Sequence, residues 1–118
     1  METGAMGEDI AARYLEALGF EILERNFRSR AGEIDIVARD GETIVFVEVK
    51  ARRPGPFGVA SEQVTARKRR RLVNTALAYM AARHMTGAGC RFDVVAVDIP
   101  RHGPPVVQLV EGAFECWR

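Results

Sequence analysis

The chain has 118 residues, of which 47% are hydrophobic and 28% are charged, an ordinary balance for one globular domain over residues 1–118. A formal net charge of +1 argues neither for nor against a nucleic-acid partner. No apolar run approaches the ~20 residues that cross a bilayer, and no secretory signal opens the chain. Two cysteines, Cys90 and Cys116, are too few for a disulfide scaffold. We therefore expect a cytoplasmic protein without a membrane partner.

The first half of the chain predicts one helix followed by three strands. An apolar stripe at helical spacing predicts the helix over residues 5–18. The next apolar stretches read as strands at residues 20–28, 32–39 and 43–51. Between the last two, Asp40-Gly41 is a strong hairpin signal. Short connections between consecutive strands predict an antiparallel meander.

The second half predicts a loop, a second helix and two more strands. Prolines and glycines exclude regular structure over residues 53–60, and Ser61 is a candidate N-cap for a helix that runs to about His84. The apolar run at 91–98 is typical of a strand covered on both faces, and 106–111 is expected to be an edge strand. The helix is long enough for a parallel crossover. The predicted fold is α/β, a mixed sheet flanked by helices.

Three ionisable residues lie inside stretches that otherwise read as buried strand. Asp35 lies in the segment 32–37, and Glu48 and Lys50 lie in the segment 45–50. An ionised carboxylate does not enter a sheet core without a partner or a function. The pattern of an Asp followed by Glu-x-Lys on the adjacent strand is a known way of holding a divalent metal against a phosphodiester.

The register of the predicted hairpin decides whether these side chains meet. A two-residue loop at residues 40–41 pairs Arg39 with Glu42. Counting back places Asp35 opposite Phe46, so that the two carboxylates become diagonal neighbours and the lysine projects from the same face. An even-numbered loop preserves this arrangement, whereas a three-residue loop would break it.

Converging carboxylates require a positive charge between them. At about 4–5 Å and an effective dielectric constant near 20, two carboxylates repel by ~3–4 kcal/mol. Mg²⁺ (or Mn²⁺) suits such oxygen ligands, while Lys50 could orient the attacking water. Glu8, at the margin of the first helix's apolar stripe, either reaches this site or is an exposed acid that favours the helix dipole. The alternative for the whole set is ion pairing on a solvated sheet face.

Basic residues cluster in two places, after the Glu-x-Lys strand and at residues 67–71. Arg52 and Arg53 extend from the strand. In the second cluster, Arg69 lines up with the apolar face of the helix and Lys68 lies close to it, whereas the other arginines fall on the outer side. We expect these four named residues to contact phosphate. The alternative is a solvated start of the helix.

Six motifs form a specific set that covers nearly the whole chain. They are Gly7-Glu8, Asn26-Phe27-Arg28, the segment 32–37, the segment 45–52, Lys68 and the segment 91–95. Together they resemble the YraN-like family of small bacterial proteins, which is similar to archaeal Holliday-junction resolvases of the restriction-endonuclease-like superfamily. The resemblance implies an α-β-β-β-α-β core, in agreement with the element order read above.

The resemblance also implies roles for single residues. Asp35 and Glu48 match the metal-binding acids, Lys50 matches the catalytic lysine, Glu8 matches a helix-borne acid and Lys68 matches a basic position. Since the resolvases act as dimers on branched DNA, it implies a homodimeric, metal-dependent DNA endonuclease for branched or damaged DNA. Two alternatives stay open: a nucleic-acid-binding module on the same fold without catalysis, and a protein-interaction domain whose acids are structural.

Overall fold

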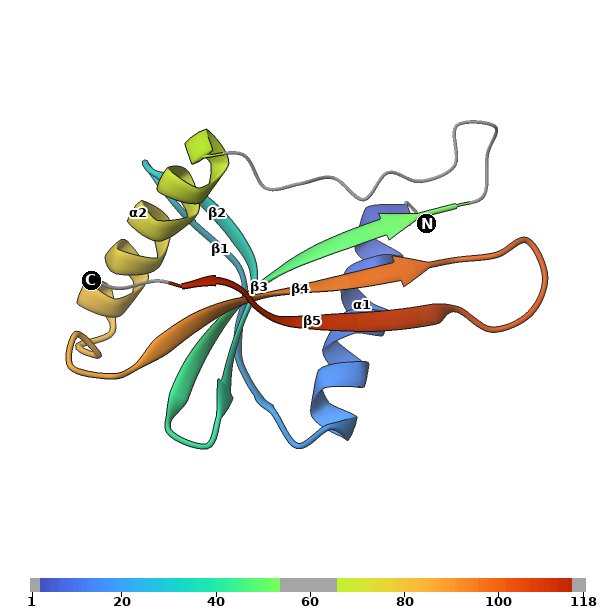
Figure 1. The fold of residues 1–118 in the computed structure, drawn as a ribbon, viewed down its shortest axis with the longest axis horizontal. Helices are drawn as coiled ribbons and strands as arrows, with labels where there is room; N and C mark the ends of the chain where they lie inside the picture. Colours follow the sequence, from blue (N-terminus) through green and yellow to red (C-terminus); the bar gives the residue numbers. More distant parts are fainter. Residues whose placement is uncertain (1–2, 54–65, 116–118) are drawn as a thin grey trace.

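A computed structural model describes residues 3–53 and 66–115. Its elements follow the predicted order (Figure 1): α1 (Thr3–Ala17), β1 (Glu21–Ser29), β2 (Gly32–Asp40), β3 (Thr43–Arg52), α2 (Ala66–Ala82), β4 (Cys90–Asp98) and β5 (Val106–Glu115). The predicted N-cap Ser61 and nearly all of the predicted loop lie outside the described residues. Helix α2 ends two residues before His84, whose positive φ of 59° does not continue a helix.

The five strands form one sheet in the order β1-β2-β3-β4-β5. The first three strands are antiparallel neighbours, β3 and β4 are parallel, and β5 is antiparallel to β4 at the edge. The predicted α/β class, with a meander, a helical crossover and a final edge strand, is confirmed. In the described part of the chain, neither helix combines the length and the apolar character needed to cross a bilayer.

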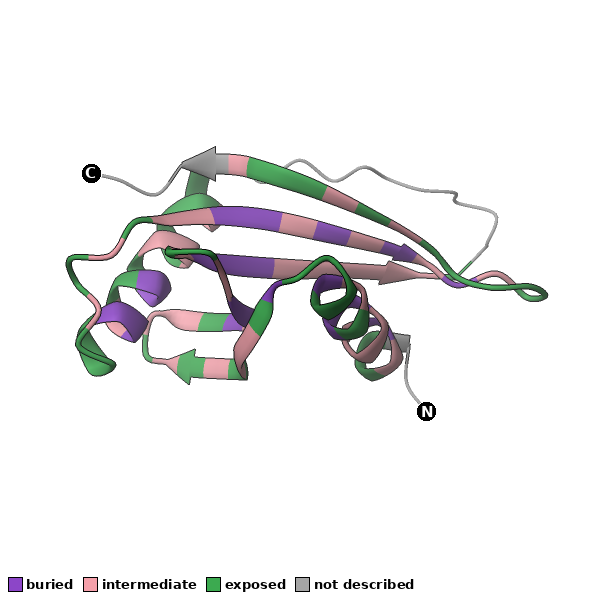
Figure 2. Cartoon of the chain, turned by 90° about the horizontal axis from the view of Figure 1, so that it is seen from below, coloured by how far each residue is buried: buried purple, intermediate pink, exposed green. Residues whose placement is uncertain are grey.

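The two helices bury different sides of the central strand β3. Val45 and Val47 belong to a cluster with Leu15 of α1, whereas Phe46 belongs to a second cluster with Tyr79 of α2. Helix α1 packs mainly on β3, and α2 packs on β2 and β1. Figure 2 shows that the buried positions lie on the middle strands and the inner sides of the helices. The near-continuous apolar sequence of β3 is explained by this cover on both sides.

The register of the β2–β3 hairpin differs from the prediction. Arg39 lies opposite Ile44 rather than opposite Glu42, because the turn consists of Gly41 and Glu42. Gly41 has a φ of 64°, which a glycine adopts without steric cost at the first position of a tight turn. The shift amounts to two residues. Since side chains alternate with a period of two, the shift alone moves no side chain of the paired ladder to the other face.

The same shift changes the predicted relation between the two candidate metal acids. Val37, and not Asp35, lies opposite Phe46. The regular ladder ends with the pair that contains Ile36, and the next residue on each strand is one of the acids, Asp35 or Glu48. They therefore follow the last ladder pair directly, where the sequence had predicted a diagonal relation.

Strand β2 changes its face at Asp35. Ile34 packs in the α2 cluster and Ile36 packs in the α1 cluster, although residues two apart in a regular strand share a face. On β1, the register places Asn26 opposite Asp35, and Asn26 has a φ of 58°. Asparagine tolerates this left-handed conformation better than most residues. The bend leaves the Asp35 carboxylate free to turn toward β3.

Candidate active site

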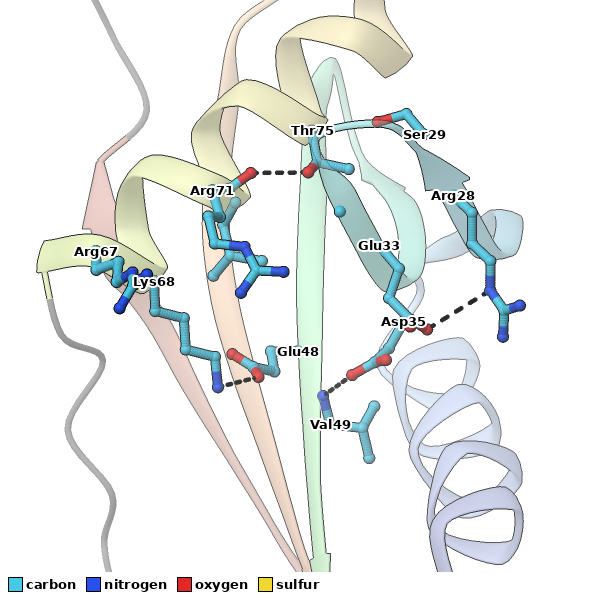
Figure 3. A pocket seen from close by; sticks show the side chains of 12 residues that line it. Arg28, Ser29, Glu33, Asp35, Glu48, Val49, Arg67, Lys68, Arg71 and Thr75 are labelled. Carbon is cyan, nitrogen blue, oxygen red and sulfur yellow. Dashed lines mark hydrogen bonds and ion pairs between the residues drawn. The ribbon is translucent and has the colours of Figure 1, made fainter.

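A cavity of about 880 Å³ lies between α2 and strands β1 to β3. Figure 3 shows that its charged groups are divided between two walls. The strand wall carries Glu33, Asp35 and Glu48, and the helix wall carries Arg67, Lys68 and Arg71. Arg28 of β1 also lines it. The cavity therefore faces acids on the sheet with bases on the helix.

Asp35 is held against the backbone of β3 by one hydrogen bond. The amide N–H of Val49 donates to Asp35 Oδ2 at 2.8 Å. Burial raises the pKa of Asp35 to about 6; the Val49 bond opposes this rise, and the negative charges of Glu8, Glu48 and Glu33 add to it. Either protonation or a nearby cation would therefore stabilise this carboxyl group in the folded protein.

Glu48 makes contact with both lysines of the chain. Its Oε2 lies 2.6 Å from Lys68 Nζ and 3.7 Å from Lys50 Nζ. Its Oε1 is buried and has no hydrogen-bond partner in the described part of the protein. A buried acceptor without a partner costs about 1–3 kcal/mol, more when it is charged. This oxygen is therefore a candidate ligand for a cation.

Lys50 and Glu8 approach the two acids from different elements. Lys50 follows Glu48 by two residues on β3, and its side chain is one-third exposed. Glu8 lies on α1, where its Oε1 is 3.7 Å from Arg25 Nη2. Glu8 is near enough to raise the pKa of Asp35, yet it is absent from the described lining of the cavity. The structure thus places Lys50 beside Glu48 but, like Glu8, outside the described lining of the cavity.

Of the four predicted phosphate-binding residues, only Lys68 lines the cavity in the described part of the chain. Arg52 is turned to β4, where its Nε and Nη2 both donate to the Asp98 carboxylate. Arg53 is exposed after the end of β3. Arg69 is also exposed, although it precedes Leu72 and Val73, which pack in the α2 cluster, by three and four residues and is therefore in line with the buried face of the helix, as predicted. Its neighbours Lys68 and Arg71 line the cavity.

Three basic residues of the cavity were missed by the sequence interpretation: Arg28, Arg67 and Arg71. Arg67 and Arg71 had been assigned to the outer side of the helix. They are four residues apart and therefore share a helix face. Thr75, four residues after Arg71, is fully buried and lines the same cavity. This spacing could have predicted that both arginines lie on the cavity side of the helix.

The donor set fits a hard divalent cation. Within residues 3–53 and 66–115, no three His, Cys, Asp or Glu side chains gather into a ready-made metal cage. Mg²⁺ does not need one, since it commonly keeps several waters and uses one or two carboxylates plus substrate phosphates. The unsatisfied Oε1 of Glu48 and the raised pKa of Asp35 both favour a cation between these acids.

Comparison with known proteins assigns the chain to a family. The model of the uncharacterised protein family UPF0102 matches residues 7–97, which include both acids and both lysines of the site. The chain belongs to this family. The resemblance to YraN-like proteins, drawn from the motifs, is thereby confirmed at the family level.

Relatives in the UPF0102 family match nearly their whole length. A UPF0102 protein of Geobacter sulfurreducens is 48% identical over 112 residues, which cover 95% of this chain and 88% of the relative. One of Moorella thermoacetica is 48% identical over 112 residues, covering 94% of this chain and 93% of the relative. One of Frankia casuarinae is 46% identical over 111 residues, covering 94% of each chain.

Proposed function

We propose that this UPF0102 protein is a divalent-metal-dependent endonuclease that hydrolyses phosphodiester bonds in DNA. One observation carries the proposal: Asp35 and Glu48 line the same polar cavity, and Oε1 of Glu48 is buried without a partner in the described structure. The likeness of the motifs to Holliday-junction resolvases of the restriction-endonuclease-like superfamily supports branched or damaged DNA as the substrate.

The proposed roles follow from the placement of each side chain. Asp35 and Glu48 would hold Mg²⁺ or Mn²⁺ from adjacent strands. When bound, such an ion polarises a phosphoryl oxygen and lowers the pKa of water. The ammonium group of Lys50, 3.7 Å from Glu48, can orient the attacking water or stabilise developing negative charge. The charge of Glu8 makes a cation beside Asp35 more favourable.

The position of the Lys68 side chain would change when a divalent ion binds to the acids. Its Nζ is 2.6 Å from Glu48, and the side chain is 37% exposed, so it can leave this contact without breaking a packed core. Two unit charges 4 Å apart interact by about 4 kcal/mol at an effective dielectric constant of 20, and a divalent ion doubles this repulsion. Lys68 would therefore turn from Glu48 into the cavity, toward the substrate phosphate.

A second candidate is a nucleic-acid-binding module on this fold that does not cleave. It is favoured by the close ion pair of Lys68 with Glu48, which already neutralises one of the two acids. Metal titration separates the candidates. A module of this kind binds DNA with a steep salt dependence and gains no metal-dependent stability that Asp35→Ala removes.

A nuclease assay on branched, nicked and linear DNA tests the leading proposal. We expect cleavage with Mg²⁺ or Mn²⁺, none in EDTA, and a loss on the order of 100-fold for Lys50→Ala. Glu48→Gln should be at least as inactive. The matched control is Glu42→Gln, which makes the same change in the exposed turn of the same hairpin. If wild type and Lys50→Ala are equally inactive on every substrate, hydrolysis is excluded.

A further inference from the structure

We infer that Arg67 and Arg71 form a binding site for the sugar–phosphate backbone of a nucleic-acid strand, on the helix wall of the cavity, which acts without metal and without reading bases. The inference deepens the proposed function and rests on it only for the identity of the ligand. It concerns residues that neither the motifs nor the predicted phosphate contacts had included.

Among the described basic residues of the cavity, these two arginines differ from the others in their ion pairing. Lys68 is paired with Glu48, and Arg28 Nε lies 3.9 Å from Glu33 Oε2. Across residues 3–53 and 66–115, Arg67 and Arg71 take part in no ion pair, and both are exposed. Two guanidinium groups therefore face the cavity with their charge uncompensated.

Their placement works against the stability of the helix. Arg67 and Arg71 are four residues apart on α2, and like charges at this spacing destabilise a helix. They also belong to a basic run near the start of a helix whose first turn contains no acidic residue, although that end favours negative charge. Local conflicts of this kind are expected where function selects the residues. An anion on this wall would relieve both conflicts.

The ligand is a phosphate backbone rather than a set of bases. The described residues that line the cavity include no aromatic side chain on which a base could stack, and no Asn or Gln to read a base edge. Arginine binds phosphate through two parallel N–H···O bonds, independent of sequence. The acids on the opposite wall disfavour a small free anion, whereas a strand can place successive phosphates along the helix wall and past the acids.

Binding of labelled 20-nucleotide strands in EDTA tests the site without any metal. We compare wild type with Arg67→Gln/Arg71→Gln by fluorescence anisotropy at several salt concentrations. The matched control is Arg70→Gln/Arg101→Gln, which removes the same charge from two exposed arginines outside the described lining. We expect the cavity variant to bind at least about tenfold more weakly, with a salt slope lower by roughly 0.7 for each lost contact. The control and the two homopolymers, oligo-dT and oligo-dA, should agree with wild type within about threefold.

Two results would overturn the inference: an equal loss in the control variant, which would indicate diffuse attraction, or a preference above about tenfold for one homopolymer. The cavity variant should melt at or above the wild-type temperature, since it removes a like-charge pair at i,i+4 spacing on the helix. Should the double variant fail to fold, each single Gln variant is measured in its place. Cleavage is assayed separately. If the cavity variant loses binding and wild type shows no cleavage, the result supports this site and excludes the nuclease. If the cavity variant binds and cleaves like wild type, the result excludes this site and supports the nuclease.

Discussion

Asp35 is a carboxylate whose ionised form the fold disfavours. Its burial, with the charges of Glu8, Glu48 and Glu33, outweighs the Val49 hydrogen bond and raises the pKa to about 6, against about 3.9 for an ordinary aspartate. Between about pH 4 and pH 6 the folded protein therefore binds more protons than the unfolded chain. Stability falls as pH rises through this window and receives no further change from Asp35 above it. At neutral pH the ionised group is a cost that a bound cation would relieve.

Replacing Asp35 by asparagine should therefore stabilise the metal-free protein at pH 7.5. We expect a gain of about 1 kcal/mol, a value discounted because the side chain is partly exposed, and no gain at pH 4. Asparagine keeps an oxygen for the Val49 amide. Urea unfolding in EDTA at both pH values measures the effect, with Glu42→Gln as the control. Equal stability of wild type and Asp35→Asn at pH 7.5 would contradict the assigned pKa.

At the same scale, sequence reasoning found the acids but not all of their surroundings. Asp35 and Glu48 were visible because carboxylates stand out within apolar runs. Asp93, inside the apolar run of β4, is 1% exposed and accepts hydrogen bonds from the side chain of Arg91 and the backbone N–H of Gly112. That N–H is presented where β5 breaks register with β4, and Gly112 has a φ of 58°. A pattern along one strand cannot show a bulge in its neighbour.

Helix α1 approaches β3 closely enough to involve backbone atoms. Gly7 is buried, and a Cβ at this position would overlap the side chain of Ala51 near the end of β3. The next residue is Glu8, whose charge acts on Asp35. The absence of a side chain at Gly7 thus sets how near the helix-borne acid comes to the site.

The close approach predicts that Gly7→Ala destabilises the protein, although alanine favours a helix more than glycine does. Overpacking typically costs 1–3 kcal/mol and the helix gain is about 1 kcal/mol, so we expect a net loss of about 1 kcal/mol. Ala51→Gly added to Gly7→Ala should recover part of the loss, as a double-mutant cycle by urea unfolding would show. Gly4→Ala is the control, since a Cβ there meets nothing within 4 Å. If Gly7→Ala and Gly4→Ala were equally stabilising, the contact would not be tight.

Among the elements, the sequence predicted existence and order better than register. Apolar runs and Gly/Pro breaks located all five strands, because burial on both sides of β3 leaves a strong pattern. The choice of turn residues was wrong by one position, which shifted the pairing of Arg39 by two residues. The change of face at Asp35 was invisible, since a period-two pattern assumes a regular strand and Asn26 opposite it is not in a regular conformation.

For the whole molecule, the net charge of +1 conceals a strong separation of charge. Acids from β2 and β3 face bases from α2 across one cavity, and the sheet order together with the packing of α2 on β2 brings these elements together. Composition could not reveal this, because the two signs cancel in the sum. The family match covers residues 7–97 and therefore includes the residues that build both walls.

Metal binding should appear as a change in the stability of the whole protein. A ligand present at 100 times its dissociation constant stabilises the folded state by about 2.7 kcal/mol, which corresponds to a rise in melting temperature of several degrees for a domain of this size. We expect this rise for wild type when Mn²⁺ replaces EDTA. It should vanish in Asp35→Asn and in Glu48→Gln, because each removes one of the two cavity carboxylates that we propose to bind the ion. Glu33→Gln is the matched control: it is exposed on the same wall and lies beside Arg28, so its response to Mn²⁺ should equal that of wild type. A rise of the same size in all four proteins would show that the ion binds elsewhere.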